Sequence, residues 1–258
     1  MIIFRIFLGV LRVIIFITSS LIIFTLFKLV RLFFSKFRHL RSALNRIIFK
    51  CWSVTLIKAM GGKIEVKKWD VKKKTVFVSN HISYLDIIIL NAVHPFAFVA
   101  KSEIAGWPLL GSLAKGVDTI FLDRSNPLAV KNLYKDIDYK LEHGDSVLIF
   151  PEGTTSSGED LLEFKKGIFM PILRAKKHED VLGCLAIKYS MDKKYGDQKN
   201  KIAWWGDMEF LGHFWSLVMI PKWKVVVSAQ EYCIGERRVS SVVSKDTYEV
   251  VKEEFGKI

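Results

Sequence analysis

Acidic residues are almost absent from the first quarter of this 258-residue chain. Residues 1–74 contain sixteen lysines and arginines but only two acids, Glu65 and Asp70, which gives this segment a net charge of +14. The remaining residues are close to neutral, at −1. A globular domain that binds nucleic acid would be expected to carry the positive charge itself. The charge distribution therefore points to a partner of the N-terminal segment, and we predict no nucleic-acid partner.

Cysteines are also scarce, and internal repeats and low-complexity linkers are absent. The three cysteines, Cys51, Cys184 and Cys233, are far apart in the sequence, which excludes a Cys-x-x-Cys metal or redox pair. We predict no metal site, and a reduced compartment is the simplest interpretation. Half of the residues are apolar, so the chain can bury one large core.

A run without any charge lies near the N-terminus. Residues 13–27, VIIFITSSLIIFTLF, contain no charged side chain, and Arg12 is the only charge between Ile6 and Phe27. These fifteen residues are fewer than the about 20 that cross a bilayer core, but the span approaches that length if Arg12 extends to the lipid headgroups. A signal peptide is disfavoured, because no small-residue cleavage site follows and the next residues are strongly basic.

Two further interpretations of this segment are disfavoured. A buried core helix is disfavoured because four consecutive turns rich in Ile and Phe leave almost no polar face. A nucleic-acid track is disfavoured because a basic stripe interleaved with Phe, Leu and Ile suits a lipid surface better. We therefore predict a membrane anchor that contacts the bilayer, and the sequence leaves open whether it spans both leaflets.

Beyond residue 74, short apolar runs alternate with helical patterns, which is typical of a layered α/β domain. Strands are predicted at 75–79, 96–100, 118–123, 146–150, 181–187 and 224–229. Helices are predicted at 84–93, 107–115, 127–142, 165–177 and 244–255. The fold class is α/β, with a mixed, largely parallel sheet flanked by helices. The clearest helix is 127–142, since Asn126 can cap it, Pro127 suits its first turn and Gly144 can end it. The stretch KKWDVKKK, 67–74, is interpreted only as a basic junction.

The stretch NHISYLD, Asn80 to Asp86, places a histidine and an aspartate five residues apart between two apolar elements. If Ser83 caps the following helix, Ser83 and Asp86 form a capping pair, and Asp86 could serve the helix start alone. The alternative is that the Asp86 carboxylate folds back onto the His81 imidazole. It would then fix the tautomer and leave the other ring nitrogen able to take a proton.

A nucleophile to complete a hydrolytic triad is missing. No Gly-x-Ser-x-Gly elbow occurs anywhere in the chain. A His–Asp pair without its own nucleophile is suited to activate a hydroxyl that the substrate brings. A serine hydrolase acting on lipids remains an alternative, and so does a non-catalytic membrane-tethered binding protein.

Two further stretches are candidates for binding an anion. In PEGTTSSG, Pro151 to Gly158, a buried strand leads into glycine and hydroxyl residues, whose N–H and O–H groups can line an anion, although an ordinary turn would look the same. In FLDR, Arg124 follows another strand beside Asp123, where a surface ion pair is the alternative. If the sheet is parallel, both stretches and the His–Asp pair leave carboxyl ends of strands and converge on one crevice.

Four stretches, in order NHISYLD, KSEIAGWPLLG, GVDTIFLDR and FPEGTTSSG, together resemble the glycerolipid acyltransferase family. Bacterial members of this family include 1-acyl-sn-glycerol-3-phosphate acyltransferases, and the resemblance covers roughly residues 75–190. It implies that His81 is the catalytic base and Asp86 its orienting partner. It also implies an acceptor or phosphate site formed by Lys101, Arg124, Glu152, Gly153, Thr154 and Thr155, with Lys165 and Lys166 as further possible cations.

The resemblance also implies an activity and a location. The chain would be a membrane-bound O-acyltransferase of phospholipid biosynthesis that moves an acyl group from acyl-CoA or acyl carrier protein to the free hydroxyl of a lysolipid. It would need no cofactor and would work at the cytoplasmic face of a bacterial inner membrane. Residues 1–50 would form the membrane anchor and a basic juxtamembrane helix, and residues 51–258 the catalytic domain.

The first choice of acceptor is 1-acyl-sn-glycerol-3-phosphate, giving phosphatidate. One departure weakens this choice, because many members specific for lysophosphatidate have an arginine where this chain has Thr155. The segment WWGDMEFLGHFW, 204–215, also resembles members that act on other lysolipids, so a lyso-ornithine lipid is the alternative acceptor. Within this segment, Asp207 and His213 are interpreted as structural or as lying at the headgroup entrance.

Overall fold

The computed structural model describes residues 2–72, 74–107, 110–178, 180–196, 201–236 and 238–258. Within these residues, a seven-stranded sheet has the order β1-β7-β6-β2-β5-β3-β4. Among the described pairs only β6 and β7 run antiparallel, which confirms the predicted mixed, largely parallel sheet. The strands are β1 (Gly62–Asp70), β2 (Val76–Ser79), β3 (Phe96–Lys101), β4 (Ile120–Leu122), β5 (Ser146–Ile149), β6 (Val181–Met191) and β7 (Trp223–Cys233).

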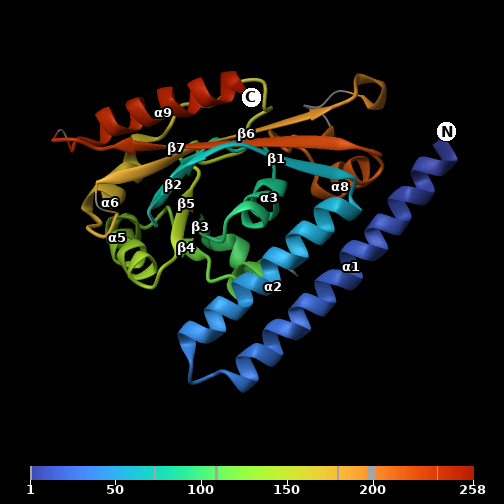
Figure 1. The fold of residues 1–258 in the computed structure, drawn as a ribbon, viewed down its shortest axis with the longest axis horizontal. Coiled ribbons are helices and arrows are strands. Elements are labelled where there is room, and N and C mark those ends of the chain that lie inside the picture. The colour runs from blue at the N-terminus through green and yellow to red at the C-terminus, as the bar shows by residue number, and fades with distance from the viewer. Residues whose placement is uncertain (1, 73, 108–109, 179, 197–200, 237) are drawn as a thin grey trace.

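Helices cover both faces of this sheet. The helix α9 packs on β6 and β7 from one side, and α2 and α3 lie on the other side (Figure 1). The helices are α1 (Ile2–Phe33), α2 (Arg38–Ala59), α3 (Leu85–Val93), α4 (Leu110–Gly116), α5 (Pro127–Glu142), α6 (Phe169–Arg174), α8 (Phe210–Val218) and α9 (Ser240–Lys257). Short 3-10 turns lie at Ser102–Gly106, Lys166–Ile168 and Lys193–Tyr195.

The central strands are predictable because both of their faces are covered. Every residue of β2 and β5 is buried, so these strands are continuous apolar runs rather than alternating ones. Since β2, β5, β3 and β4 are parallel neighbours, their carboxyl ends meet at one edge of the sheet. This edge receives the segments that follow Ser79, Lys101, Leu122 and Ile149.

Several elements differ from the prediction. The strand β1 was missed, because its lysine-rich sequence lies at the sheet edge and mostly faces solvent. The helix α8 was also missed. The helix predicted at 165–177 is a 3-10 turn followed by the shorter α6, and the strand predicted at 118–123 is limited to β4. The helix predicted at 107–115 is described from Leu110 onward as α4, and positions 108–109 lie outside the described residues.

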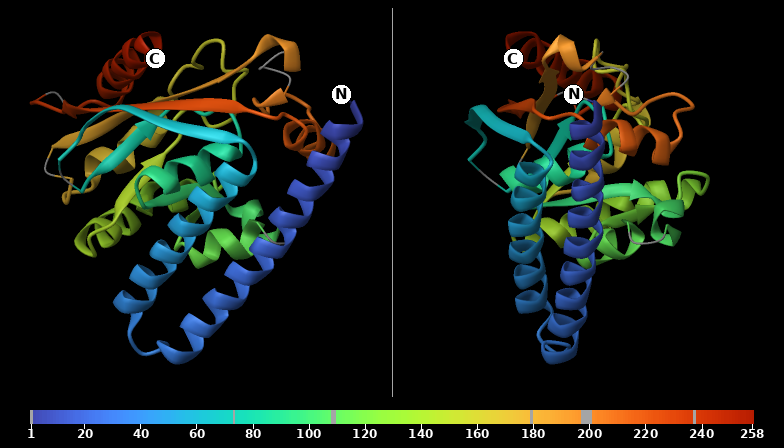
Figure 2. Two further views of the ribbon diagram at one scale, coloured as in Figure 1. Left: turned by 45° about the vertical axis from the view of Figure 1, so that its right-hand side comes forward. Right: turned by 90° about the vertical axis from the view of Figure 1, so that its right-hand side faces the viewer.

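The two N-terminal helices form an antiparallel hairpin that projects from the body of the protein (Figures 1 and 2). By length and composition, α1 is able to cross a membrane, and it is the one helix of the described residues that passes this test. The other helix, α2, continues into the core, where Trp52, Leu56 and Ile57 are buried. The predicted domain boundary at residue 50 therefore falls inside α2, and the division into two domains stays a prediction.

The expectation that Arg12 extends to lipid headgroups is wrong. Its side chain is buried, with an exposed fraction of 4%. The guanidinium donates to the backbone carbonyls of Ala59 at 3.0 Å, Val218 at 3.0 Å, Ile220 at 2.5 Å and Pro221 at 3.1 Å. These carbonyls lie at the C-terminal ends of α2 and α8, where a helix leaves acceptors without intrahelical partners and favours a cation. Arg12 thus joins α1 to two helices of the body.

Gly61 makes this arrangement possible. Its φ of +76° lies in the left-handed region, which residues with a Cβ atom rarely adopt. A Cβ atom at this position would also overlap the carbonyl oxygen of Pro221 and the guanidinium of Arg12. The turn between α2 and β1 therefore requires glycine for both its backbone conformation and its packing.

Candidate active site

The His–Asp pair lies in the turn between β2 and α3. The Nδ1 atom of His81 is 2.7 Å from Oδ2 of Asp86. The side chain of Asp86 is fully buried, whereas that of His81 is 19% exposed. Because the carboxylate holds Nδ1, Nε2 is the ring nitrogen that can take a proton from a substrate. The structure thus brings the two predicted catalytic residues together.

Asp86 also supports the start of α3, so both interpretations of the motif hold. Its Oδ2 atom accepts the backbone N–H groups of Ile82 at 2.7 Å and Ser83 at 3.1 Å. The predicted capping role of the Ser83 hydroxyl is wrong, because the helix begins at Leu85, and the flanking residue is Tyr84, whose side chain accepts no capping hydrogen bond. The Ser83 hydroxyl lies 3.4 Å from the Leu85 nitrogen, which is a long hydrogen bond.

Three residues that hold the pair in place were not predicted from the sequence. The buried Asn80 amide exchanges two hydrogen bonds of 2.9 Å with the backbone of Ile187 on β6. The His81 ring stacks on Phe150, with centroids 3.9 Å apart. The Tyr189 hydroxyl donates to Oδ1 of Asp86. Asn80 and Phe150 are part of the quoted motifs, so spacing could have drawn attention to them, but nothing local connects Tyr189 to Asp86.

The loop after β5 closes over the same turn. The Ser156 N–H donates to the His81 carbonyl oxygen at 2.8 Å, which ties the FPEGTTSSG loop to the NHISYLD turn. Gly153 adopts a φ of +74° and donates its N–H to the Phe150 carbonyl at 3.1 Å. A left-handed residue is needed for this tight turn, which explains the glycine.

Two cations meet at Gly153. Nη1 of Arg124 donates to the Gly153 carbonyl at 2.9 Å. A Cβ atom built on Gly153 would lie 2.8 Å from Nζ of Lys165 and 3.3 Å from Nη1 of Arg124, so both cations approach one point. Within the described part of the chain, neither forms an ion pair with an acid. Burial lowers the pKa of Arg124 while Glu103 opposes this shift. Two unneutralised cations at a glycine turn are suited to bind an anion.

Glu152 is not exposed at the acceptor site. It is 1% exposed, and neither of its carboxyl oxygens has a hydrogen-bond partner among the described residues. Burial raises the pKa of Glu152 to about 8. The backbone amides of His81 and Leu162 oppose this shift, although neither forms a hydrogen bond of good geometry, and Asp86 adds to it. Glu152 therefore lies beside the His–Asp pair and carries a proton at neutral pH.

This protonation predicts how stability depends on pH. Between the ordinary value of 4.5 and about 8, folded Glu152 keeps a proton that the unfolded chain releases. The free energy of unfolding therefore falls as pH rises through this window. The variant Glu152→Gln stays neutral, so its melting temperature should fall less than that of the wild type as pH is raised from about 5 to about 9. Thermal melts across this range measure the effect, with exposed Glu249→Gln as the control. Parallel curves for the wild type and Glu152→Gln would show that Glu152 is ionised.

The other predicted acceptor residues lie at the same edge without a contact that assigns them a role. Lys101 ends β3, and Thr154 and Thr155 follow Gly153. Among the described residues, none of these three side chains takes part in a hydrogen bond or ion pair. The exposed Lys166 lies at the same loop. Their roles stay predictions.

The segment 204–215 packs on the catalytic turn. The backbone N–H of Trp204 donates to the Ile82 carbonyl at 3.0 Å. His213 is buried, its Nδ1 atom is 3.1 Å from the Tyr84 hydroxyl, and burial lowers its pKa. Its partner is thus Tyr84 rather than Asp207, which agrees with the structural interpretation. Over the residues described, no cluster of three or more His, Cys, Asp or Glu side chains is able to hold a metal ion.

Comparisons with known proteins identify the central segment. Residues 61–185 match the model of the family described as Acyltransferase. A 1-acyl-sn-glycerol-3-phosphate acyltransferase of Neisseria gonorrhoeae is 38% identical over 97 residues, which cover 38% of each chain. A lyso-ornithine lipid O-acyltransferase of Pseudomonas aeruginosa is 30% identical over 175 residues, which cover 68% of this chain and 65% of the relative. The matched regions thus span only part of these relatives, and they confirm the resemblance that the four motifs predicted.

The fold is also found in a solved structure. The crystal structure of the 1-acyl-sn-glycerophosphate (LPA) acyltransferase PlsC from Thermotoga maritima matches with a TM-score of 0.62. The match covers 95% of this chain and 97% of the other, at 19% sequence identity. The shared architecture includes nearly the whole chain and confirms the predicted fold class.

Proposed function

We propose that this chain, whose residues 61–185 belong to the acyltransferase family, is an O-acyltransferase that moves an acyl group from a thioester to the hydroxyl of a lysolipid. The observation that carries the proposal is the 2.7 Å contact between His81 Nδ1 and Asp86 Oδ2 in a chain that lacks a nucleophilic serine elbow. Such a pair supplies a general base without a covalent nucleophile. The donor is acyl-CoA or acyl carrier protein.

The reaction follows from this geometry. Nε2 of His81 takes the proton of the lysolipid hydroxyl while the oxygen attacks the thioester carbon. The tetrahedral oxyanion then collapses, the carbon–sulfur bond breaks, the sulfur takes the proton from His81, and the donor leaves as a thiol. Asp86 holds the imidazole through Nδ1 and stabilises the imidazolium. The mechanism needs no cofactor, because the acyl group arrives already activated.

The acceptor that we propose is 1-acyl-sn-glycerol-3-phosphate. Its phosphomonoester carries close to two negative charges, and Arg124 and Lys165 at Gly153 would provide two matching cations. A lyso-ornithine lipid is the second candidate, supported by Thr155 in place of an arginine and by the Pseudomonas relative, which matches 68% of this chain. A zwitterionic headgroup needs fewer cations than a phosphate does.

The variant Arg124→Ala should raise the KM for lysophosphatidate by about 10-fold or more with a smaller change in kcat, because a charged hydrogen bond to phosphate contributes about 1.5–3 kcal/mol. Steady-state rates of thiol release measure this effect. The control is Arg174→Ala, which removes an exposed arginine that stacks on Tyr134 away from the site. An unchanged KM would place the phosphate elsewhere.

A panel of acceptors separates the two candidates. Purified full-length protein is supplied with acyl-CoA and, in turn, with lysophosphatidate and a lyso-ornithine lipid in mixed micelles, and thiol release is followed. A higher kcat/KM for lysophosphatidate supports the first candidate, and Thr155→Arg should then be tolerated or should improve its use. A higher value for the lyso-ornithine lipid establishes the second candidate instead.

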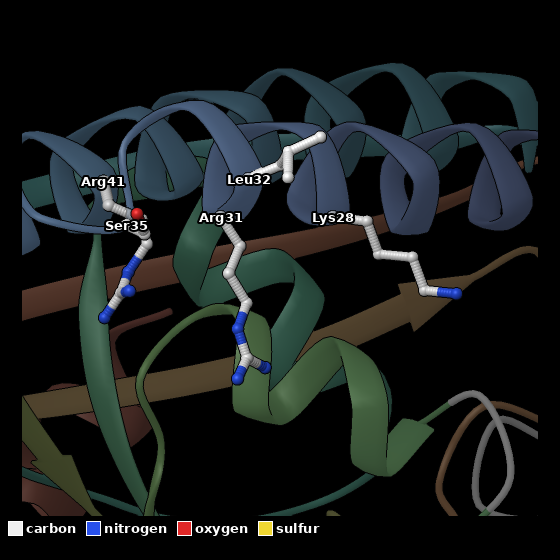
Figure 3. Close-up of a pocket in the computed structure, with 5 residues that line it drawn as sticks. All are labelled: Lys28, Arg31, Leu32, Ser35 and Arg41. Atoms are coloured by element: carbon white, nitrogen blue, oxygen red, sulfur yellow. The ribbon is translucent and has the colours of Figure 1, made fainter.

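Membrane association is also part of the proposal. The end of the hairpin carries Lys28, Arg31 and Arg41 around a shallow pocket completed by Leu32 and Ser35 (Figure 3). Apolar side chains on the outer face of α1 and at the hairpin end are exposed, among them Phe4, Phe7, Ile14, Leu21, Ile22, Phe33 and Phe37. Exposed apolar residues next to cations suit a bilayer with anionic headgroups. We therefore propose that the protein binds a bilayer through this hairpin, and that the bilayer is a bacterial inner membrane with the catalytic domain at its cytoplasmic face.

A further inference from the structure

A tyrosine contacts the catalytic carboxylate from the far side. Tyr189 lies on β6, and its side chain is almost fully buried. Its hydroxyl is 2.5 Å from Oδ1 of Asp86, the carboxylate oxygen that does not contact His81. The other oxygen already receives His81 and two backbone N–H groups. Among the described residues, Tyr189 is the one side chain that forms a hydrogen bond with Oδ1 of Asp86.

We propose that Tyr189 is a positioning residue for the catalytic pair, acting through its hydrogen bond to Oδ1 of Asp86. The hydroxyl fixes the rotation of the carboxylate so that Oδ2 faces His81. This role rests on the proposed function, because it concerns the same general base. No motif of the sequence contains Tyr189, and it lies 103 residues from Asp86.

The direction of the hydrogen bond is settled by the chemistry of the two groups. A carboxylate only accepts, so the tyrosine must donate. Burial raises the pKa of Tyr189 well above its ordinary value, and the neighbouring Asp86 charge adds to the shift, so the hydroxyl keeps its proton. A hydrogen bond from a neutral hydroxyl to a buried carboxylate is among the stronger ones in proteins.

The position of the hydroxyl is fixed by rigid structure. Tyr189 lies two residues beyond Ile187, whose backbone is clamped by Asn80, so β6 is held against the catalytic turn at this point. On its other side Tyr189 pairs with Val225 of β7, and its ring packs on Trp223 with centroids 6.1 Å apart. A side chain held by a central strand and its neighbours positions a partner more accurately than one on a loop.

Two other titratable groups face the pair. Glu152, from the loop after β5, acts on Asp86 through its charge when ionised. Tyr84, from the turn before α3, would act on Tyr189 through its charge if it were ionised. Burial raises the pKa of Tyr84, so the Tyr84 hydroxyl stays neutral. With Glu152 protonated near neutral pH, Asp86 is the carboxylate in contact with His81, and Tyr189 is the hydroxyl in contact with that carboxylate.

Loss of the hydroxyl should therefore change the proton affinity of the pair. In Tyr189→Phe the carboxylate loses one donor, its negative charge is less dispersed, and it binds the imidazolium more strongly. His81 should then take up its proton at a pH about one unit higher than in the wild type. The kcat at neutral pH should fall by a factor of up to about 10, the largest loss of unprotonated base that a one-unit shift allows, with KM unchanged, because the group acts on the base and not on substrate binding.

The test measures protonation of His81 directly and needs no substrate. Protein labelled with carbon-13 at the histidine Cε1 atoms is titrated by NMR, and the His81 signal is assigned from its absence in His81→Ala. The control is Tyr232→Phe, which removes another tyrosine–aspartate hydrogen bond, 2.9 Å to Asp246, on the neighbouring strand. An upward shift of the His81 midpoint in Tyr189→Phe alone supports the proposal, and an unchanged midpoint overturns it.

A second variant covers the case in which Tyr189→Phe does not fold. Incorporation of 3-fluorotyrosine at position 189 keeps the hydroxyl and nearly the same volume but makes it a stronger donor. The His81 midpoint should then move to lower pH. A midpoint that stays in place, or moves upward, would overturn the proposal. If the wild type transfers no acyl group to any lysolipid, the proposed function fails, whereas these NMR shifts still decide the role of Tyr189.

Discussion

Replacement of His81 by alanine should lower kcat/KM for acyl transfer by about 100- to 10,000-fold, the range that general-base catalysis supplies. The imidazole is the proposed proton acceptor, and Asp86 contacts its Nδ1 atom, which leaves Nε2 to take the proton. The fold should persist, because the side chain is 19% exposed and its main packing contact is the stack on Phe150. Rates of thiol release, measured beside circular dichroism spectra, test both statements.

The matched control for this variant is His143→Ala. His143 is also partly exposed but lies at the end of α5, on the side of the domain away from the catalytic turn. Its replacement should leave kcat/KM within a factor of about two, since substitutions at the surface, away from the catalytic groups, usually have small effects. Substantial turnover by a well-folded His81→Ala protein would contradict the assignment of the base.

The second large effect is expected for Arg12→Met. The change keeps most of the apolar stem but removes the donors to Ala59, Val218, Ile220 and Pro221. Buried carbonyls left without a donor cost about 1–3 kcal/mol each, and part of this cost is recovered by water. We expect a loss of about 3 kcal/mol or more, which corresponds to a melting temperature lower by roughly 6–12 °C for a domain of this size.

Thermal melts in a mild detergent measure this loss. Arg5→Met is the control, since Arg5 lies on the same helix about two turns earlier, and its guanidinium lies over the ring of Tyr195 at 5.0 Å. Equal melting temperatures for Arg12→Met and the wild type would show that the guanidinium does not join α1 to the body. Deleting α1 is a poorer test, because it would also expose the core at residues that pack on Ile23 and Phe27.

Elements with strong local signals could be predicted from the sequence. The helix α5 has the predicted bounds, because its start and stop are both encoded nearby. The Asn126 side chain accepts the N–H groups of Leu128 and Ala129, and Gly144 ends the helix with a φ of +78°. The buried strands β2 and β5 were predictable for a similar reason, since every residue is apolar or small.

Elements defined by distant contacts could not be predicted. The strand β1 pairs with β7, which follows more than 150 residues later in the sequence. The lysines of β1 on their own suggest a solvated linker. Arg12 gave a similar error. Within an apolar run it suggests an extended side chain at the lipid surface, whereas its four acceptors come from the end of α2, the end of α8 and the segment that follows α8.

The same distinction applies to the site. His81 and Asp86 are five residues apart in the segment between β2 and α3, so their contact follows from local geometry. Arg124 and Gly153 come from two strands, and their contact could be expected once the sheet was taken as parallel. Burial of Glu152 and the Tyr189 hydrogen bond depend on how the loop after β5 and β6 pack on the turn. Nothing in the composition or periodicity near either residue indicates this packing.

The central claim is that the hydroxyl of a lysolipid, activated by His81, attacks the thioester directly. The most direct measurement is the release of thiol from acyl-CoA by purified protein, recorded with and without lysolipid in mixed micelles. We expect thiol release to require the acceptor, to equal the amount of acylated product, and to show no initial burst. Thiol release without acceptor, or a burst equal to the amount of enzyme, would show hydrolysis or a covalent acyl-enzyme and would contradict the account.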